Sequence, residues 1–184
     1  RGLAVSAVNN KVVVANNGDN SAEVIAISGG NLGNATNVAL GGTQPWRVAI
    51  LGAGTNVAFE RALLTDSGNN RVSAINLSTN AACDNNGLAG GNSLTLPASN
   101  TPRAIAVDPD ADAGSGRGRY FVGNATRFFI IEAGACNGVT ADSVTTNINL
   151  SGEVHDIEVN AAATLAYAAV QTTNRLRIVD IDPS

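Results

Sequence analysis

Arg47-Val-Ala-Ile50, Ala62-Leu-Leu-Thr-Asp66 and Arg71-Val-Ser-Ala-Ile-Asn76 are three short apolar runs that follow one another closely in the chain. The turn Ser67-Gly-Asn-Asn70 joins the second run to the third, and Ser93-Leu-Thr-Leu96 adds a fourth. No helical period continues across them, and each run is too short for a helix. Short apolar runs separated by Gly and Asn turns predict a small antiparallel sheet.

The same phrase recurs three more times. The four copies open at Arg1, Arg47, Arg103 and His155, so their starts lie 46, 56 and 52 residues apart. A closing run ends the first and third copies too, as Asn37-Val-Ala-Leu40 and Thr146-Asn-Ile-Asn-Leu150. This period is typical of four-stranded propeller blades. The sequence therefore predicts one all-β domain or segment, a β-propeller of four blade-like repeats at approximately 1–46, 47–102, 103–154 and 155–184.

The last blade is predicted to be incomplete, because no closing run follows Arg175-Leu-Arg-Ile-Val-Asp180. Three interpretations are open: a segment of a larger ring, which we favour, a half-ring completed by a second copy, or a four-blade ring with its own closure. An open sheet edge invites pairing, so we expect further blades, a protein partner or a homo-oligomer to cover it. The chain contains no methionine, and we expect a processed, excised or partly observed chain.

Composition limits the partners. The formal net charge is −4 with a single lysine, Lys11, and scattered arginines, which excludes the basic patch that nucleic-acid binding requires. No apolar run approaches the roughly 18 residues of a membrane span. Low lysine with abundant Asn, Thr and Gly favours an extracellular or cell-surface location. Aromatic residues are only 4 % of the chain, so the core must consist mainly of Ala, Val, Leu and Ile.

Four basic residues occupy the same position in the four repeats: Arg1, Arg47, Arg103 and His155. Each begins an innermost strand, at the rim of the expected central channel. Together they would bind a carboxylate or phosphate through forked hydrogen bonds. The interpretation we favour is structural, with each side chain bonding carbonyl groups of the neighbouring blade. No Gly-x-Ser-x-Gly motif or zinc-ligand spacing accompanies His155, the only histidine, and we assign no catalytic residue.

An acidic stretch and two cysteines complete the candidates. Asp108, Asp110 and Asp112 alternate before glycines, a pattern that suits calcium, but a solvated hairpin loop explains it as well and is favoured. Calcium is the one cofactor we consider. Cys83 and Cys136 follow the third runs of neighbouring blades, and the sequence leaves open whether they are joined.

The repeat resembles the YVTN-type repeat of surface-layer and lactonase-like seven-bladed propellers. The resemblance spans all four copies and is carried by Val14-Ala-Asn-Asn-Gly-Asp-Asn20, Leu64-Thr-Asp-Ser-Gly-Asn-Asn70, Ile178-Val-Asp180, Val107-Asp-Pro-Asp110, Pro45 and Pro102. The third copy lacks the Gly-Asn turn, and the fourth lacks the proline. Because such motifs are shared by several propeller families, the resemblance indicates fold rather than activity.

We expect a non-catalytic extracellular or cell-surface propeller that serves as a structural or partner-binding module. The alternative, which the resemblance implies, is a lactonase-like hydrolase acting on a small acidic sugar derivative or lactone through the rim arginines and His155. That activity needs an acid beside these cations, and the rim loops offer Asp19 and Asp66 in the first two repeats only.

Overall fold

Four antiparallel sheets follow one another along the chain in the computed structural model, which describes residues 2–52, 60–83, 93–97, 101–109, 118–134, 136 and 141–182. The strands of the first sheet are β1 (Leu3–Ser6), β2 (Lys11–Asn16), β3 (Ser21–Ser28) and β4 (Asn31–Ala39). Those of the second are β5 (Pro45–Leu51), β6 (Arg61–Asp66), β7 (Arg71–Asn76), β8 (Ala81–Ala82) and β9 (Ser93–Thr95). The third contains β10 (Ala104–Val107), β11 (Arg119–Gly123), β12 (Arg127–Glu132) and β13 (Ser143–Asn149), and the fourth β14 (Val154–Val159), β15 (Leu165–Val170) and β16 (Arg175–Asp180).

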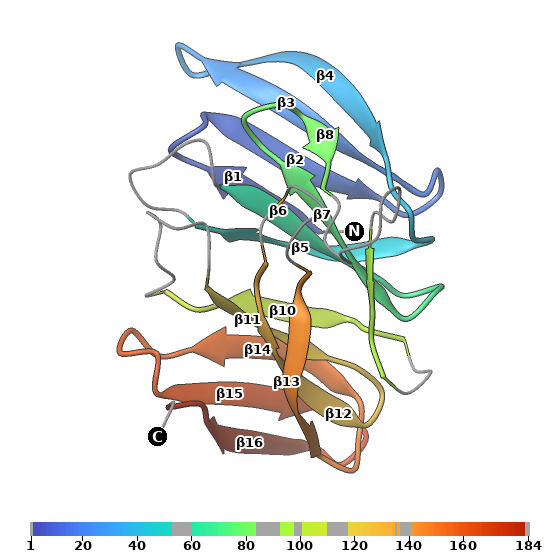
Figure 1. Cartoon of the computed structure of the whole chain (residues 1–184), viewed down its shortest axis with the longest axis vertical. Helices are drawn as coiled ribbons and strands as arrows, with labels where there is room; N and C mark the ends of the chain where they lie inside the picture. The colour runs from blue at the N-terminus through green and yellow to red at the C-terminus, as the bar shows by residue number, and fades with distance from the viewer. Residues whose placement is uncertain are drawn as a thin grey trace.

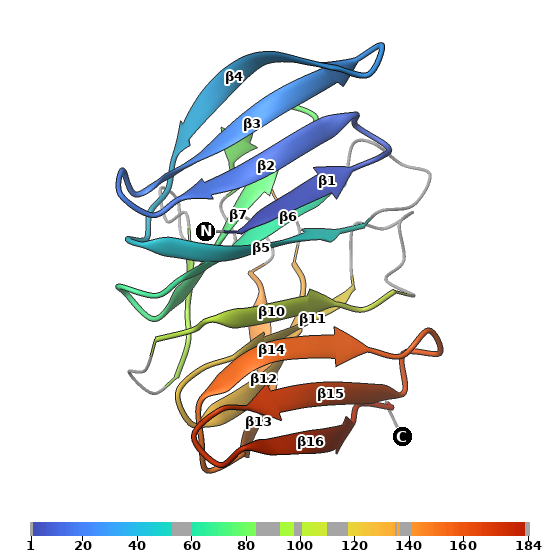
Figure 2. The same ribbon diagram turned by 180° about the vertical axis from the view of Figure 1, so that it is seen from behind.

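In each sheet the first three strands form an antiparallel meander, so the predicted all-β repeat architecture is confirmed. In the second sheet β8 and β9 both pair with β7 and share the outermost position. In the fourth sheet β16 pairs with β15, and no described strand lies on its other side. The innermost strands β1, β5, β10 and β14 lie side by side along the molecule (Figure 2).

Asparagine makes the hairpin turns. Asn20, Asn70 and Asn174 stand just before the third strand of their sheets, each with φ between 49° and 54°. This left-handed conformation is costly for most residues, and asparagine tolerates it. The Asn turns read from the sequence therefore mark where the third strand begins in the first, second and fourth sheets.

Three apolar clusters fill the spaces between the four sheets, one per joint. Val13 and Val24 of the first sheet pack with Leu64 of the second, and β6 is buried along its whole length. Small and β-branched side chains dominate, except in the third sheet, where Phe121 and Phe128 stack with ring centroids 5.8 Å apart. Burial between neighbouring sheets is the pattern expected of a repeat protein.

The alternation in the sequence predicted the buried face in most strands. The four-blade interpretation predicts that eleven apolar residues lie in strands and are mostly buried. Eight of them are buried: Val13, Ile50, Leu64, Ile75, Ile105, Phe129, Ile131 and Ile157. Ile25 and Val107 are half-buried. The expectation for Ile178 was wrong, because its side chain is 62 % exposed on the outer face of the last sheet. No helix among the described residues is long and apolar enough to cross a membrane.

Candidate functional site

The rim at the start of the innermost strands brings together cations and acids. The Arg103 guanidinium lies 2.8 Å from a Glu153 carboxylate oxygen and 5.1 Å from the centre of the Trp46 ring. These contacts join the second, third and fourth sheets at one point. Because the Arg103 charge faces both a carboxylate and an aromatic face, the side chain is held by protein groups on two sides.

Arg47 approaches an acid from two sheets away. Its guanidinium lies 4.0 Å from Asp156 at the start of the fourth sheet, with both side chains substantially exposed. Its backbone N–H donates to the Thr65 hydroxyl. Two of the predicted rim cations therefore face acids of the fourth sheet rather than the neighbouring carbonyl groups favoured from the sequence. Arg1 lies outside the described residues.

His155 stands at a β-bulge, where the register between β14 and β15 shifts between Val154 and Asp156. The ring lines a cavity of about 370 Å³ together with Gln171, Asn174, Arg175 and Leu176 at the end of the β15–β16 hairpin. The structure thus places the histidine on the last sheet, at a cavity that contains neither Arg47 nor Arg103.

Asp66 is the group at this end with the most altered acidity. Its carboxylate is fully buried beside Gly42, where a Cβ would clash with it, and the Ser73 hydroxyl donates to it at 2.5 Å. Burial raises the pKa of Asp66 to about 7, although the Ser73 hydrogen bond and the Arg71 charge oppose the rise. A pKa near 7 suits acid–base chemistry, but the burial keeps solutes from this carboxyl.

The acidic stretch is described only at its first member. Asp108 is buried, and the Arg119 guanidinium holds its carboxylate with Nε 3.0 Å and a terminal nitrogen 2.9 Å away. Arg119 also donates to the carbonyl groups of Ile181 and Ala163, and so links the third and fourth sheets. Asp110 and Asp112 lie outside the described residues, so the calcium site stays a prediction. No cluster of three metal-ligating side chains occurs in the described ranges.

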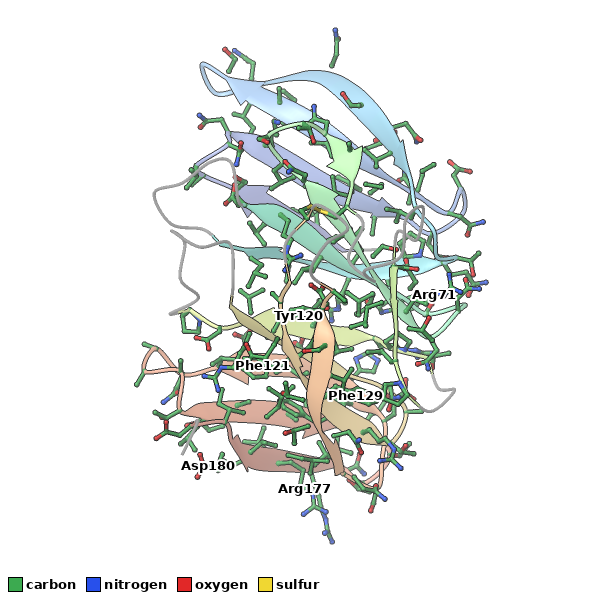
Figure 3. All side chains as sticks on the ribbon, viewed as in Figure 1. Arg71, Tyr120, Phe121, Phe129, Arg177 and Asp180 are labelled. Atoms are coloured by element: carbon green, nitrogen blue, oxygen red, sulfur yellow. A yellow bond between two sulfur atoms is a disulfide. The ribbon has the colours of Figure 1, made fainter. Side chains whose placement is uncertain are left out.

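Two charged groups that sequence reasoning missed lie at the joint of the second and third sheets, around Tyr120 (labelled in Figure 3). Arg61 of β6 and Asp142 before β13 are both buried and form an ion pair at 3.3 Å. The hydroxyl of Tyr120 donates to Asp142 at 2.7 Å, and the Gly134 N–H donates to its other oxygen at the same distance. Burial, and then the Asp142 charge, raise the pKa of Tyr120 well above its usual range.

Cys83 and Cys136 form a disulfide across the same joint, with their Cα atoms 5.0 Å apart. The bond settles the alternative that the sequence left open. Disulfides persist in oxidising compartments, so this cross-link is typical of a protein that matures outside the reducing cytosol.

The stacked meanders and the row of innermost strands define a β-propeller, here a partial one. Solved structures confirm this class at the level of the fold. The match to a functionally unknown protein from Desulfotomaculum acetoxidans covers 98 % of this chain and 54 % of that protein's chain, with a TM-score of 0.71 and 14 % identity. The match to a protein from Bacteroides uniformis described as a "putative 6-phosphogluconolactonase" covers 98 % of this chain and 53 % of that protein's chain, with a TM-score of 0.70 and 16 % identity.

A nidogen/laminin complex contains a third such structure, with a TM-score of 0.61 and 16 % identity over 97 % of this chain and 59 % of that one. The chain therefore spans little more than half the length of these three solved structures. No family model and no curated protein matches the sequence. At these identities the likeness establishes the fold and leaves the activity to the site.

Proposed function

We propose that this chain is a non-catalytic, extracellular or cell-surface propeller module with a structural or partner-binding role. The observation that carries the proposal is the position of the apolar side chains left bare. All five exposed large hydrophobic residues of the described chain lie on the two end sheets: Leu3, Val5, Leu32, Leu176 and Ile178. Exposed apolar side chains gathered on a sheet face are typical of sites that contact other protein.

The register shows that these side chains belong to continuous faces. In the first sheet Leu3 pairs with Val14, and Val5 pairs with Val12, which pairs in turn with Ile25. Directly paired residues share one face of a sheet, so this outer face is largely apolar. In the fourth sheet Tyr167 pairs with Ile178. Such faces form the joints inside the molecule, which supports a role in packing against further protein.

The rim supports the same proposal. Arg103 and Arg47 face Glu153 and Asp156, so these cations are compensated before any anionic ligand arrives. The disulfide supports an extracellular location.

The alternative, a lactonase-like hydrolase, draws on the likeness to the Bacteroides structure and on the pKa of Asp66 near 7. It would require Asp66 to reach a substrate at the rim, and this carboxyl is buried under the connection between the first two sheets. The described rim therefore pairs Arg103 and Arg47 with Glu153 and Asp156, and the burial of Asp66 keeps that carboxyl from a substrate held there.

One experiment compares both functions. Sedimentation velocity of the chain at rising concentration should show self-association through the bare faces, which Leu3→Glu reduces. Ser28→Glu, a change at an exposed position at the end of β3, is the matched control and should leave it unchanged. In parallel, hydrolysis of 6-phosphogluconolactone should not exceed the buffer rate. A chain that stays monomeric and hydrolyses the lactone, with the rate lost in Arg103→Gln, would overturn the proposal.

A further inference from the structure

The outermost position of the fourth sheet is empty in the described structure, whereas the other three sheets fill it. β4, β9 and β13 each pair antiparallel with the third strand of their own sheet. β16 is the third strand of the fourth sheet and has β15 as its ladder partner. An unpaired row of backbone N–H and C=O groups is a template for one more strand.

Cavities lie along this position. One of about 440 Å³ is lined by β13 residues, Leu150 and the β16 residues from Arg177 to Asp180. A second of about 270 Å³ continues between the third sheet and the end of β16, with Ile130 and Ile148 in its wall. Arg177 and Asp180 lie on the last strand at the end of the molecule opposite β4 (Figure 3). The space beside β16 therefore forms a groove bounded by the third sheet.

The three filled positions share a sequence. Their strands end in a polar residue, an aliphatic residue, a small or polar residue and a leucine: Asn37-Val-Ala-Leu40, Ser93-Leu-Thr-Leu96 and Asn147-Ile-Asn-Leu150. The aliphatic residue pairs with the second residue of the third strand in every case, as Val38 with Ala22, Leu94 with Val72 and Ile148 with Phe128. The residue of β16 that corresponds to Ala22, Val72 and Phe128 is Leu176. Its side chain is 64 % exposed, whereas those of Ala22, Val72 and Phe128 are fully buried.

Two hydrogen bonds recur with this sequence. The leucine N–H donates to the carbonyl of the residue just before the third strand, from Leu40 to Asn20, Leu96 to Asn70 and Leu150 to Thr126. The side chain of the first polar residue bonds the first residue of the third strand, as Asn37 with Ser21, Ser93 with Arg71 and Asn147 with Arg127. In the fourth sheet the equivalent groups are the Asn174 carbonyl and the Arg175 guanidinium.

We propose that the groove beside β16 binds an extended strand of the pattern polar, Val/Ile/Leu, small or polar, Leu, paired antiparallel with β16. Its polar residue lies opposite Arg177 and bonds Arg175, its aliphatic residue lies beside Leu176, and its leucine N–H donates to Asn174. The leucine side chain lies toward the cavity lined by His155, Asn174 and Leu176. This inference rests on the proposed partner-binding function and names the chemistry of the partner.

The test uses a fluorescent peptide with the sequence of residues 143–150, Ser-Val-Thr-Thr-Asn-Ile-Asn-Leu, titrated with the chain and followed by anisotropy. We expect saturable binding and slower hydrogen exchange in β16. N-methylation of the peptide's leucine, which removes the donor to Asn174, should weaken binding about tenfold. Leu176→Asp should weaken it at least as much, and Arg175→Ala should weaken it a few-fold.

Leu32→Asp is the matched control, because it places the same charge at an equally exposed leucine on the outermost strand of the first sheet. It should leave peptide binding unchanged, and circular dichroism should show that every variant remains folded. No binding by the folded chain would overturn the inference, as would binding insensitive to both Leu176→Asp and N-methylation. Dimerisation that excludes the peptide would assign the groove to a second copy and also overturn it. These results concern peptide binding alone. The proposed module function is tested separately, by self-association and lactone hydrolysis.

Discussion

The same sequence repeat occurs at the joint of the second and third sheets and in the two end sheets, but its surroundings differ. At the joint, a disulfide, a buried Arg61–Asp142 ion pair and a cluster of twelve buried residues lock two sheets together. At the ends, repeat-equivalent residues are bare: Leu3 is 65 % exposed, whereas its counterpart Ile105 is 9 % exposed. Burial in this molecule is therefore set by the neighbouring sheet and not by the strand itself.

The largest difference in the free energy of unfolding should appear when Ile105 and its counterpart Leu3 are each replaced by aspartate. Ile105→Asp places an unpaired carboxylate between two sheets and should lower the free energy of unfolding by about 4 kcal/mol. Leu3→Asp should change it by less than about 1 kcal/mol, because the carboxylate remains in water. Urea unfolding followed by circular dichroism measures both values. Equal losses would show that the end face of the first sheet is covered in solution.

Removing one partner of the buried ion pair should lower the free energy of unfolding nearly as much as Ile105→Asp does. Asp142→Ala leaves the Arg61 charge and the Tyr120 hydroxyl buried without their acceptor, and should destabilise the chain by about 3 kcal/mol. Asp156→Ala removes the exposed partner of Arg47 and should cost less than about 1 kcal/mol. Thermal unfolding of the two variants checks the contrast. A small effect for Asp142→Ala would mean that water reaches this joint.

The smallest effect depends on pH and concerns the joint of the first two sheets. The pKa of Asp66 rises from 3.8 to about 7 on folding, so the folded chain binds more protons than the unfolded chain between these values. The contribution of Asp66 to the free energy of unfolding should therefore be fully present at low pH and fall as the pH rises, by about 2 kcal/mol from pH 5 to pH 7.

Asp66→Asn should remove this contribution and keep the acceptor for Ser73. The check is the urea midpoint of both chains across that range. A slope that the variant retains would assign the pH dependence to other groups.

Sequence reasoning reached the sheets because apolar runs and Asn turns are local signals. It failed at Ile178 because alternation identifies a face without telling whether another sheet lies against it. Arg61 and Asp142 were missed because they are 81 residues apart and only the stacking of two blades brings them together. A signal was present, however, since a charge that opens an otherwise apolar run requires a buried partner.

The rim shows a different kind of error. Arg47 and Arg103 were predicted at the start of innermost strands, and they lie there. Their acidic partners, Glu153 and Asp156, flank His155 closely in the sequence, but acids do not recur at these positions in the other repeats, so the repeat pattern does not point to them. The signal for both pairs is the presence of acids at the opening of the fourth repeat, opposite in charge to the arginines that open the second and third.

The disulfide also determines how the chain would bear tension. It joins positions 53 residues apart, close to one repeat. A force applied at the two ends would be carried past the intervening segment by the covalent bridge. About 180 Å of contour length would stay locked until the bond is reduced. A propeller segment anchored between a surface and a partner could thus yield at its outer sheets while β11 and β12, which lie inside the bridged loop, remain shielded from the load.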